Sequence, residues 1–116
     1  MTITLYGIAN CDTVKQARGW LDGLGIAYAF HDYKRAGVDA GKLAHWVEQA
    51  GWEKVLNRSG TTFRKLADSD KADLDSAKAI ALMLANPSAI KRPIMEYGGG
   101  GLLVGFDPVT WSTALT

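Results

Sequence analysis

Cys11 is the only cysteine in the sequence, and it lies in a polar loop between a short apolar run and a stretch with helical spacing. At the start of a helix, backbone N–H groups and the positive end of the helix dipole are available, and both lower the pKa of a thiol. Lys15 and Arg18, one and two turns into that helix, would add positive potential. A lone cysteine is commonly just a small buried apolar residue. The polar loop favours a functional nucleophile over that alternative.

Arg92–Pro93 is the second candidate, because it stands at the entrance to a predicted strand. An X–Pro peptide bond at such a place can be cis, as it is in some tight turns. The planar guanidinium of Arg92 suits a carboxylate or an oxyanion. The alternative is a solvated loop arginine beside Lys91, and the residue types alone leave both interpretations open.

The other polar motifs are better explained by structure than by chemistry. His31 and His45 are not spaced to serve the thiol as a base or to bind a metal, so we predict no metal site. Arg58 is a weaker candidate, since solvation explains most arginines of its kind. The run Gly98–Gly101 lacks the helix start and the Lys-Ser/Thr pair of a phosphate loop, and it predicts a hairpin turn.

A βαβ unit is predicted around Cys11. Ile3–Ile8 is typical of a buried strand, apolar residues recur at helical spacing from Val14 to Leu24, and Ile26–Tyr33 alternates like a second strand. Because the connections run through a helix, the two strands should be parallel. The expected boundaries of this helix are Asp12 or Thr13 as its cap and Gly23 or Gly25 as its end.

A block of helices is predicted next. Its helices should cover Val38–Ala50, with Asp39 as the cap, then Trp52–Leu56, and Leu74–Leu84. This block looks like an insertion between two halves of one sheet.

Strands return near the carboxyl end. Pro93–Tyr97 and Leu102–Phe106 should pair antiparallel across the glycine run, and Asp107 should open a final short helix that reaches Trp111. The order of elements predicts an α/β fold with a mixed sheet.

The composition restricts the class of protein. A chain of 116 residues suits one domain and can bury a core without disulfides. A net charge of +1 gives no electrostatic reason to expect nucleic acid as a partner. The opening stretch MTITLYGIAN lacks the basic region of a signal peptide, and its apolar run is too short to cross a membrane. We therefore expect a cytoplasmic monomer that binds neither membrane nor nucleic acid.

Several segments of the chain, taken together, resemble one family. They are Asn10–Arg18, Asn57–Arg58 ahead of Phe63–Leu66, Asn86–Pro87 with Lys91–Ile94, and Val104–Phe106. In this combination and spacing the sequence resembles the arsenate reductase (ArsC)/Spx family, and within it the YffB-like branch. The resemblance extends from about Ile3 to Trp111.

This resemblance implies a thioredoxin-like fold with a mixed sheet and an inserted helical subdomain. Residues 1–116 would form a single ArsC-like domain, with its core at about 1–35 and 89–116 and the insertion at about 36–88. The resemblance also implies that Cys11 is the nucleophile and that Arg92 assists the thiolate and binds anionic substrate. The residues expected to bind substrate or glutathione are Asn10, Thr13, Lys15, Arg58 and Pro93, the last of these after a cis peptide bond.

Two departures from the family pattern bear on activity. Leu103–Asp107 lacks an arginine that arsenate reductases of this kind carry in the last hairpin, which makes arsenate reductase the least favoured function. Val14 stands where Spx-type regulators commonly have a second cysteine, so no disulfide can form within the chain.

The expected function is that of a glutathione-dependent monothiol reductase. Cys11 would form a mixed disulfide with an oxidised substrate, and glutathione, as a co-substrate, would resolve it without any bound cofactor. The alternative is an Spx-like transcriptional regulator that binds RNA polymerase without a Cys-x-x-Cys switch.

Overall fold

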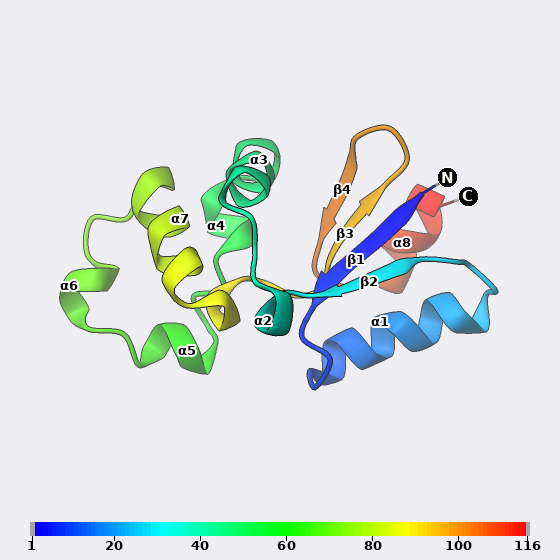
Figure 1. The fold of residues 1–116 in the computed structure, drawn as a ribbon, viewed down its shortest axis with the longest axis horizontal. Coiled ribbons are helices and arrows are strands. Elements are labelled where there is room, and N and C mark those ends of the chain that lie inside the picture. Colours follow the sequence, from blue (N-terminus) through cyan, green and yellow to red (C-terminus); the bar gives the residue numbers. More distant parts are fainter. Residues whose placement is uncertain (1, 116) are drawn as a thin grey trace. The chain divides into compact units, whose positions relative to one another are not determined.

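The computed structural model describes residues 2–115 of the protein (Figure 1). The chain divides into two compact units, one formed by the segment up to Ala36 together with the segment from Arg92 onward, the other by Gly37–Lys91. The insertion expected from the sequence ran from about 36 to 88, so the second unit extends three residues further along the chain. Among residues 2–115, no helix has the length and apolar character needed to cross a membrane.

A four-stranded mixed sheet forms the centre of the first unit. It contains β1 (Ile3–Gly7), β2 (Ala29–Asp32), β3 (Ile94–Tyr97) and β4 (Gly101–Val104) in the order β2-β1-β3-β4. β1 pairs parallel with β2, as the βαβ prediction requires, while β3 pairs antiparallel with both β1 and β4. The predicted α/β architecture with a mixed sheet is confirmed.

The core of this unit lies between the sheet and two helices, α1 (Asp12–Gly23) and α8 (Pro108–Leu115). Alternate residues of a strand point to the same side of a sheet, so Leu5 and its neighbour Met95 both face these helices. The buried residues of this cluster are Ile3, Leu5, Ala17, Leu21, Met95 and Trp111.

The end of α1 explains why β2 is shorter than predicted. Gly25 has a φ of 69° and ends the helix, as expected from the sequence. The N–H groups of Gly25 and Ile26 donate to the carbonyls of Asp22 and Leu21 at 3.1 and 3.0 Å, which is the Schellman arrangement. Because the N–H of Ile26 closes the helix, the predicted strand over 26–33 begins only at Ala29.

The final hairpin and helix also differ from their predicted lengths. Gly105, with a φ of 84°, turns the chain away, and its N–H donates to the carbonyl of Pro93 at 2.8 Å. β4 therefore ends at Val104 instead of 106. The carbonyl of Gly105 accepts a 3.1 Å hydrogen bond from the indole of Trp111, and α8 continues past Trp111 to Leu115.

One short helix, α2 (Tyr33–Ala36), completes the first unit, and the second unit is helical. Asp39 caps the first helix of the second unit, as predicted, and its carboxylate accepts from the N–H of Lys42 at 2.9 Å. Asp75 caps α7 in the same way, so the predicted helix over 74–84 begins two residues later. The elements of the second unit are α3 (Ala40–Ala50), α4 (Trp52–Val55), α5 (Thr61–Arg64), α6 (Asp68–Lys71), α7 (Ser76–Ala85) and η1 (Pro87–Ala89).

Candidate active site

Cys11 occupies the N-cap position of α1. Its backbone is extended, with φ −97° and ψ 129°, and its carbonyl accepts the first helical hydrogen bond, from the N–H of Lys15 at 2.9 Å. The predicted cap at Asp12 or Thr13 is therefore wrong, because both residues already lie inside the helix. The Cys11 side chain is half-buried and carries a free thiol.

Gly7 allows the first turn of α1 to lie directly against the end of β1. A Cβ atom at Gly7 would come within 2.8 Å of the Cγ2 atom of Val14, closer than Cβ atoms approach other atoms in real structures. Val14 itself is completely buried. The position of Cys11 above the sheet edge thus depends on a glycine four residues before it.

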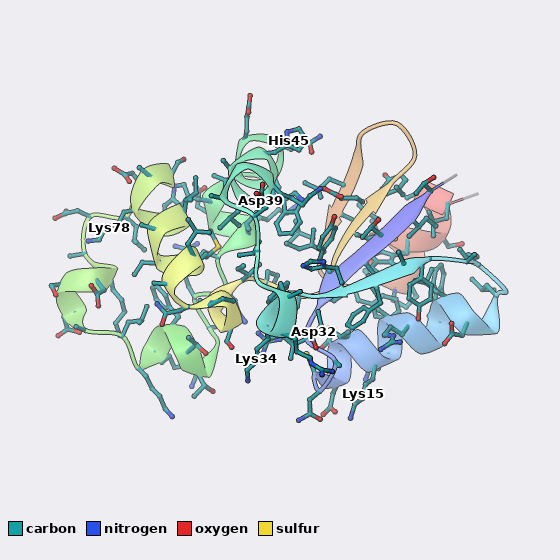
Figure 2. All side chains as sticks on the ribbon, viewed as in Figure 1. Lys15, Asp32, Lys34, Asp39, His45 and Lys78 are labelled. Carbon is teal, nitrogen blue, oxygen red and sulfur yellow. The ribbon has the colours of Figure 1, made fainter. Side chains whose placement is uncertain are left out.

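Asp32 ties the loop before Cys11 to the neighbouring strand (Figure 2). Its carboxylate accepts from the N–H of Ala9 at 3.2 Å, and from the N–H groups of Lys34 and Arg35 at 3.0 and 3.3 Å. Burial opposes the charge of Asp32, but these N–H groups and the charge of Arg35 outweigh it, so the pKa of this carboxyl lies below its ordinary value. A charged carboxylate therefore connects β2, α2 and the Cys11 loop.

Arg92 reaches the Cys11 sulfur from the segment directly before β3. Tyr6, near the end of β1, pairs with Ile94 at the start of β3, so the residues before β3 lie at the sheet edge from which the Cys11 loop departs. The guanidinium of Arg92 donates a hydrogen bond to the Cys11 sulfur. The peptide bond between Arg92 and Pro93 is cis, as expected, and Pro93 is buried.

The electrostatics of this pair favour a thiolate. Partial burial raises the pKa of Cys11, but the N–H of Val14, the Arg92 guanidinium and the N–H of Thr13 outweigh it, so that this pKa lies below its ordinary value. The sulfur does not form a full capping hydrogen bond. The N–H groups of Thr13 and Val14 are nevertheless directed at the sulfur and lower its pKa. For Arg92, burial is likewise outweighed by Cys11 and Tyr33, and the pKa of the guanidinium is raised.

Tyr33 is a member of this site that the sequence analysis missed. Its side chain is completely buried at the start of α2, and its hydroxyl is hydrogen-bonded to the Arg92 guanidinium. Burial strongly raises the pKa of this phenol, in spite of the nearby charge of Arg92. The sequence offered one signal, a tyrosine at the end of a predicted strand, since a buried phenol needs a polar partner.

The remaining predicted site residues fall into two groups. In the first unit, Asn10 and Lys15 are exposed on either side of Cys11, and Thr13 contributes its backbone N–H to the thiol. Arg58 belongs to the second unit, where its guanidinium lies over the ring of Trp52 at 5.2 Å from the centroid.

The histidines have other surroundings. His31 packs against the ring of Tyr6, with 5.2 Å between the ring centroids, and His45 is exposed on α3 (Figure 2). Within residues 2–115, no group of three or more His, Cys, Asp or Glu side chains could hold a metal ion.

Solved structures of other proteins share this fold. The YffB protein is 58% identical in sequence and matches with a TM-score of 0.95, over 99% of this chain and 100% of its own. An arsenate reductase (ArsC) related protein from Brucella melitensis is 50% identical, with a TM-score of 0.78 over 97% of this chain and 93% of its own. These matches confirm the predicted thioredoxin-like fold and the resemblance to the YffB-like branch.

Sequence relatives point in the same direction. An uncharacterized protein of Haemophilus influenzae is 40% identical over 97% of both chains. The global transcriptional regulator Spx of Streptococcus mutans is 26% identical over 80% of this chain and 69% of its own.

A family model covers nearly the whole molecule. The model described as the ArsC family matches residues 6–114, a range that begins near the end of β1 and includes the Cys11 loop, Tyr33 and Arg92. The chain belongs to the ArsC family.

Proposed function

We propose that this protein is a glutathione-dependent monothiol reductase with Cys11 as its nucleophile and Arg92 as the group that stabilises the thiolate. The observation that carries the proposal is the half-buried Cys11 sulfur, held at the start of α1 and hydrogen-bonded by the Arg92 guanidinium. A lowered thiol pKa raises the fraction of thiolate at neutral pH, and the thiolate is the reactive form.

The proposed reaction is a pair of thiol–disulfide exchanges. The Cys11 thiolate attacks the glutathione sulfur of a mixed disulfide between glutathione and a substrate thiol, and the substrate leaves as a thiolate that takes a proton from water. A second glutathione thiolate then attacks the same glutathione sulfur, which releases Cys11 and forms glutathione disulfide. In the net reaction, the mixed disulfide and one free glutathione thiol give the substrate thiol and glutathione disulfide, so one disulfide bond is exchanged for another and no further oxidant or reductant is needed.

Glutathione is the proposed reductant because the chain has no second cysteine to resolve an intermediate. The carboxylates of glutathione also suit the chemistry of the site, since a guanidinium binds a carboxylate through two parallel hydrogen bonds. Arg92, Thr13 and Pro93 would contact the glutathione moiety, with Asn10 and Lys15 at its exposed side.

The test is formation of a mixed disulfide with oxidised glutathione, followed by intact mass spectrometry. The wild-type protein should gain one glutathione, and reduced glutathione should remove it again. Cys11→Ser should gain none, because a hydroxyl at its ordinary pKa is a weak nucleophile. Its melting temperature provides the control for folding. A wild-type protein that stays unmodified while an ordinary small thiol reacts under the same conditions would refute the proposal.

An Spx-like regulator that binds RNA polymerase is the second candidate, and the similarity to Spx of Streptococcus mutans favours it. This function would not need the Cys11 thiol to turn over. Pull-down of RNA polymerase subunits by the wild-type protein and by Cys11→Ser separates the two proposals. Binding by both proteins, without turnover of glutathione disulfides, would support the regulator.

Arsenate reduction is the activity that we expect least. The similarity to an arsenate reductase related protein supports it, but the last hairpin of this chain, from Leu103 to Asp107, contains no arginine to bind the oxyanion. Efficient turnover of arsenate by the purified protein with glutathione would replace our proposal.

A further inference from the structure

We propose that Tyr33 is a positioning residue of the Cys11 site, whose buried hydroxyl holds the Arg92 guanidinium against the Cys11 sulfur. The inference deepens the proposed function and rests on it. In this proposal, Tyr33 takes no direct part in the reaction of the Cys11 thiol. It acts through Arg92.

The sheet brings the three residues to one edge. Cys11 follows β1, the strand between β2 and β3. Tyr33 directly follows β2, whose last residue, Asp32, pairs with Gly7 at the end of β1. Arg92 precedes β3, whose first residue, Ile94, pairs with Tyr6. Because all three strands have their relevant ends at this edge, Tyr33 and Arg92 approach the Cys11 loop from its two sides.

The hydrogen bonds join these residues in one chain. The Arg92 guanidinium donates both to the Cys11 sulfur and to the Tyr33 hydroxyl. An arginine side chain has many rotamers, and holding it in one of them costs conformational entropy. Tyr33 is completely buried, so its ring is held by packing and its hydroxyl is a stationary acceptor. The ring therefore supplies the rigidity that the flexible guanidinium lacks.

A phenol suits this task better than a carboxylate would. Burial strongly raises the pKa of Tyr33, and the nearby negative groups Cys11 and Asp32 raise it further, against the opposing effect of Arg92. The phenol thus stays neutral over the range in which proteins work. A neutral acceptor orients Arg92 without cancelling its charge, and this charge remains available to the thiolate and to an anionic substrate.

The experiment compares Tyr33→Phe with a matched control, Tyr28→Phe. The Tyr28 hydroxyl accepts a 3.1 Å hydrogen bond from the Nε atom of Arg18, so the control removes a similar tyrosine–arginine bond elsewhere in the first unit. The readout is the rate of Cys11 alkylation by iodoacetamide as a function of pH. Tyr33→Phe should move the midpoint upward and slow the reaction at neutral pH by roughly three- to tenfold, the range expected for one hydrogen bond. Tyr28→Phe should match the wild type.

The double variant tests whether Tyr33 acts through Arg92. In an Arg92→Ala background, Tyr33→Phe should cause no further shift of the alkylation midpoint. Equal shifts in both backgrounds, or an unchanged midpoint in Tyr33→Phe, would overturn the inference. Because alkylation does not involve glutathione, this result is independent of whether glutathione disulfide reacts with Cys11. Failure of the proposed function would appear instead as a wild-type protein with a reactive thiol that glutathione disulfide does not modify.

A second measurement avoids any change at Tyr33. In Cys11→Ser, the thiol is absent but Tyr33 should still hold the guanidinium. Side-chain N–H signals of Arg92, observed by NMR with labelled arginine, should remain distinct and slow to exchange. Signals averaged by free rotation of the guanidinium would overturn the inference even if Tyr33→Phe fails to fold.

Discussion

The three longest helices of the described chain, 2–115, begin in two different ways. α3 and α7 begin after Asp39 and Asp75, and each carboxylate accepts a hydrogen bond from the N–H of the third residue of its helix, at 2.9 and 2.8 Å. α1 begins after Cys11, which has the same extended backbone but does not form a full capping bond. A carboxylate at this position stabilises a helix by about 1 kcal/mol. The start of α1 forgoes that stabilisation and leaves its N–H groups directed at a sulfur.

The cations near these helix starts differ as well. At α7, the Lys78 ammonium donates to the carbonyls of Ser69 and Ala72, so its charge is directed at the backbone. At α1, the Arg92 guanidinium donates to the Cys11 sulfur. A carboxylate cap thus stabilises the start of a helix, whereas the thiol at the start of α1, with N–H groups and a guanidinium directed at it, has a lowered pKa.

Removing the guanidinium should have the largest effect on this contrast. Arg92→Ala should slow glutathionylation of Cys11 by roughly tenfold, equivalent to about 1.4 kcal/mol of lost transition-state interaction. Arg92→Lys should restore only part of the rate, because an ammonium keeps the charge but lacks the planar fork. The rate is measured by intact mass, with melting temperature as the control for folding.

Arg18→Ala is the matched control for Arg92→Ala. In the wild type, the Arg18 guanidinium lies 4.2 Å from the centroid of the Phe30 ring and donates a hydrogen bond to the Tyr28 hydroxyl. Arg18→Ala should therefore have a much smaller effect on the glutathionylation rate than Arg92→Ala. If Arg92→Ala reacts as fast as the wild type, Arg92 has no role at the thiol. The start of α1 would then differ from those of α3 and α7 only in its capping residue.

Exchanging the cap residues should have the next largest effect. Cys11→Asp gives α1 the same type of cap as α7, and it should raise the free energy of unfolding by about 1 kcal/mol while abolishing the reaction. Asp75→Cys should lower the free energy of unfolding by a similar amount. Both values come from urea denaturation. A Cys11→Asp protein no more stable than the wild type would mean that the start of α1 cannot accept a cap.

The same exchange separates the effect of the helix from that of the arginine. In the Cys11→Ser background, the thiol of Asp75→Cys has a helix start but no guanidinium as its partner, so it should alkylate more slowly at neutral pH than Cys11 does in the wild type.

The smallest expected effect is on the pH dependence of stability. The pKa of Cys11 is lower in the folded protein than in the unfolded chain, where it is about 8.5. The thiolate therefore stabilises the fold fully above the unfolded pKa, and this contribution is lost as the pH falls through the folded pKa. The difference in unfolding free energy between wild type and Cys11→Ser should thus grow with rising pH across that window. A difference independent of pH would contradict the lowered pKa.

The order of elements could be predicted because each long element carries its own pattern. The buried run of β1, the helical spacing of α1 and the glycine run between β3 and β4 are all visible within a few residues. A segment of four residues is too short for a helical period to appear, so α5 and α6 were missed, although α4, which has the same length, was predicted.

The site was predictable only in part, for a related reason. Cys11 lies in a local motif, and the family resemblance connects it with Arg92. Tyr33 and Asp32 could not be found in this way, because their roles depend on which strands lie side by side. Tyr33 meets Arg92 only through the sheet order, and the Asp32 carboxylate meets Ala9 only because β2 pairs with β1.

Gly7 illustrates what a screen of all single substitutions would report for the Cys11 site. It offers no functional group, and any β-carbon there would press on Val14 at 2.8 Å and push the first turn of α1 off the sheet. Selection for thiol activity would therefore tolerate as little variation at Gly7 as at Cys11. A map of tolerated substitutions would therefore mark Gly7 as essential, although it contributes only the space that lets Val14 and the first turn of α1 lie against β1.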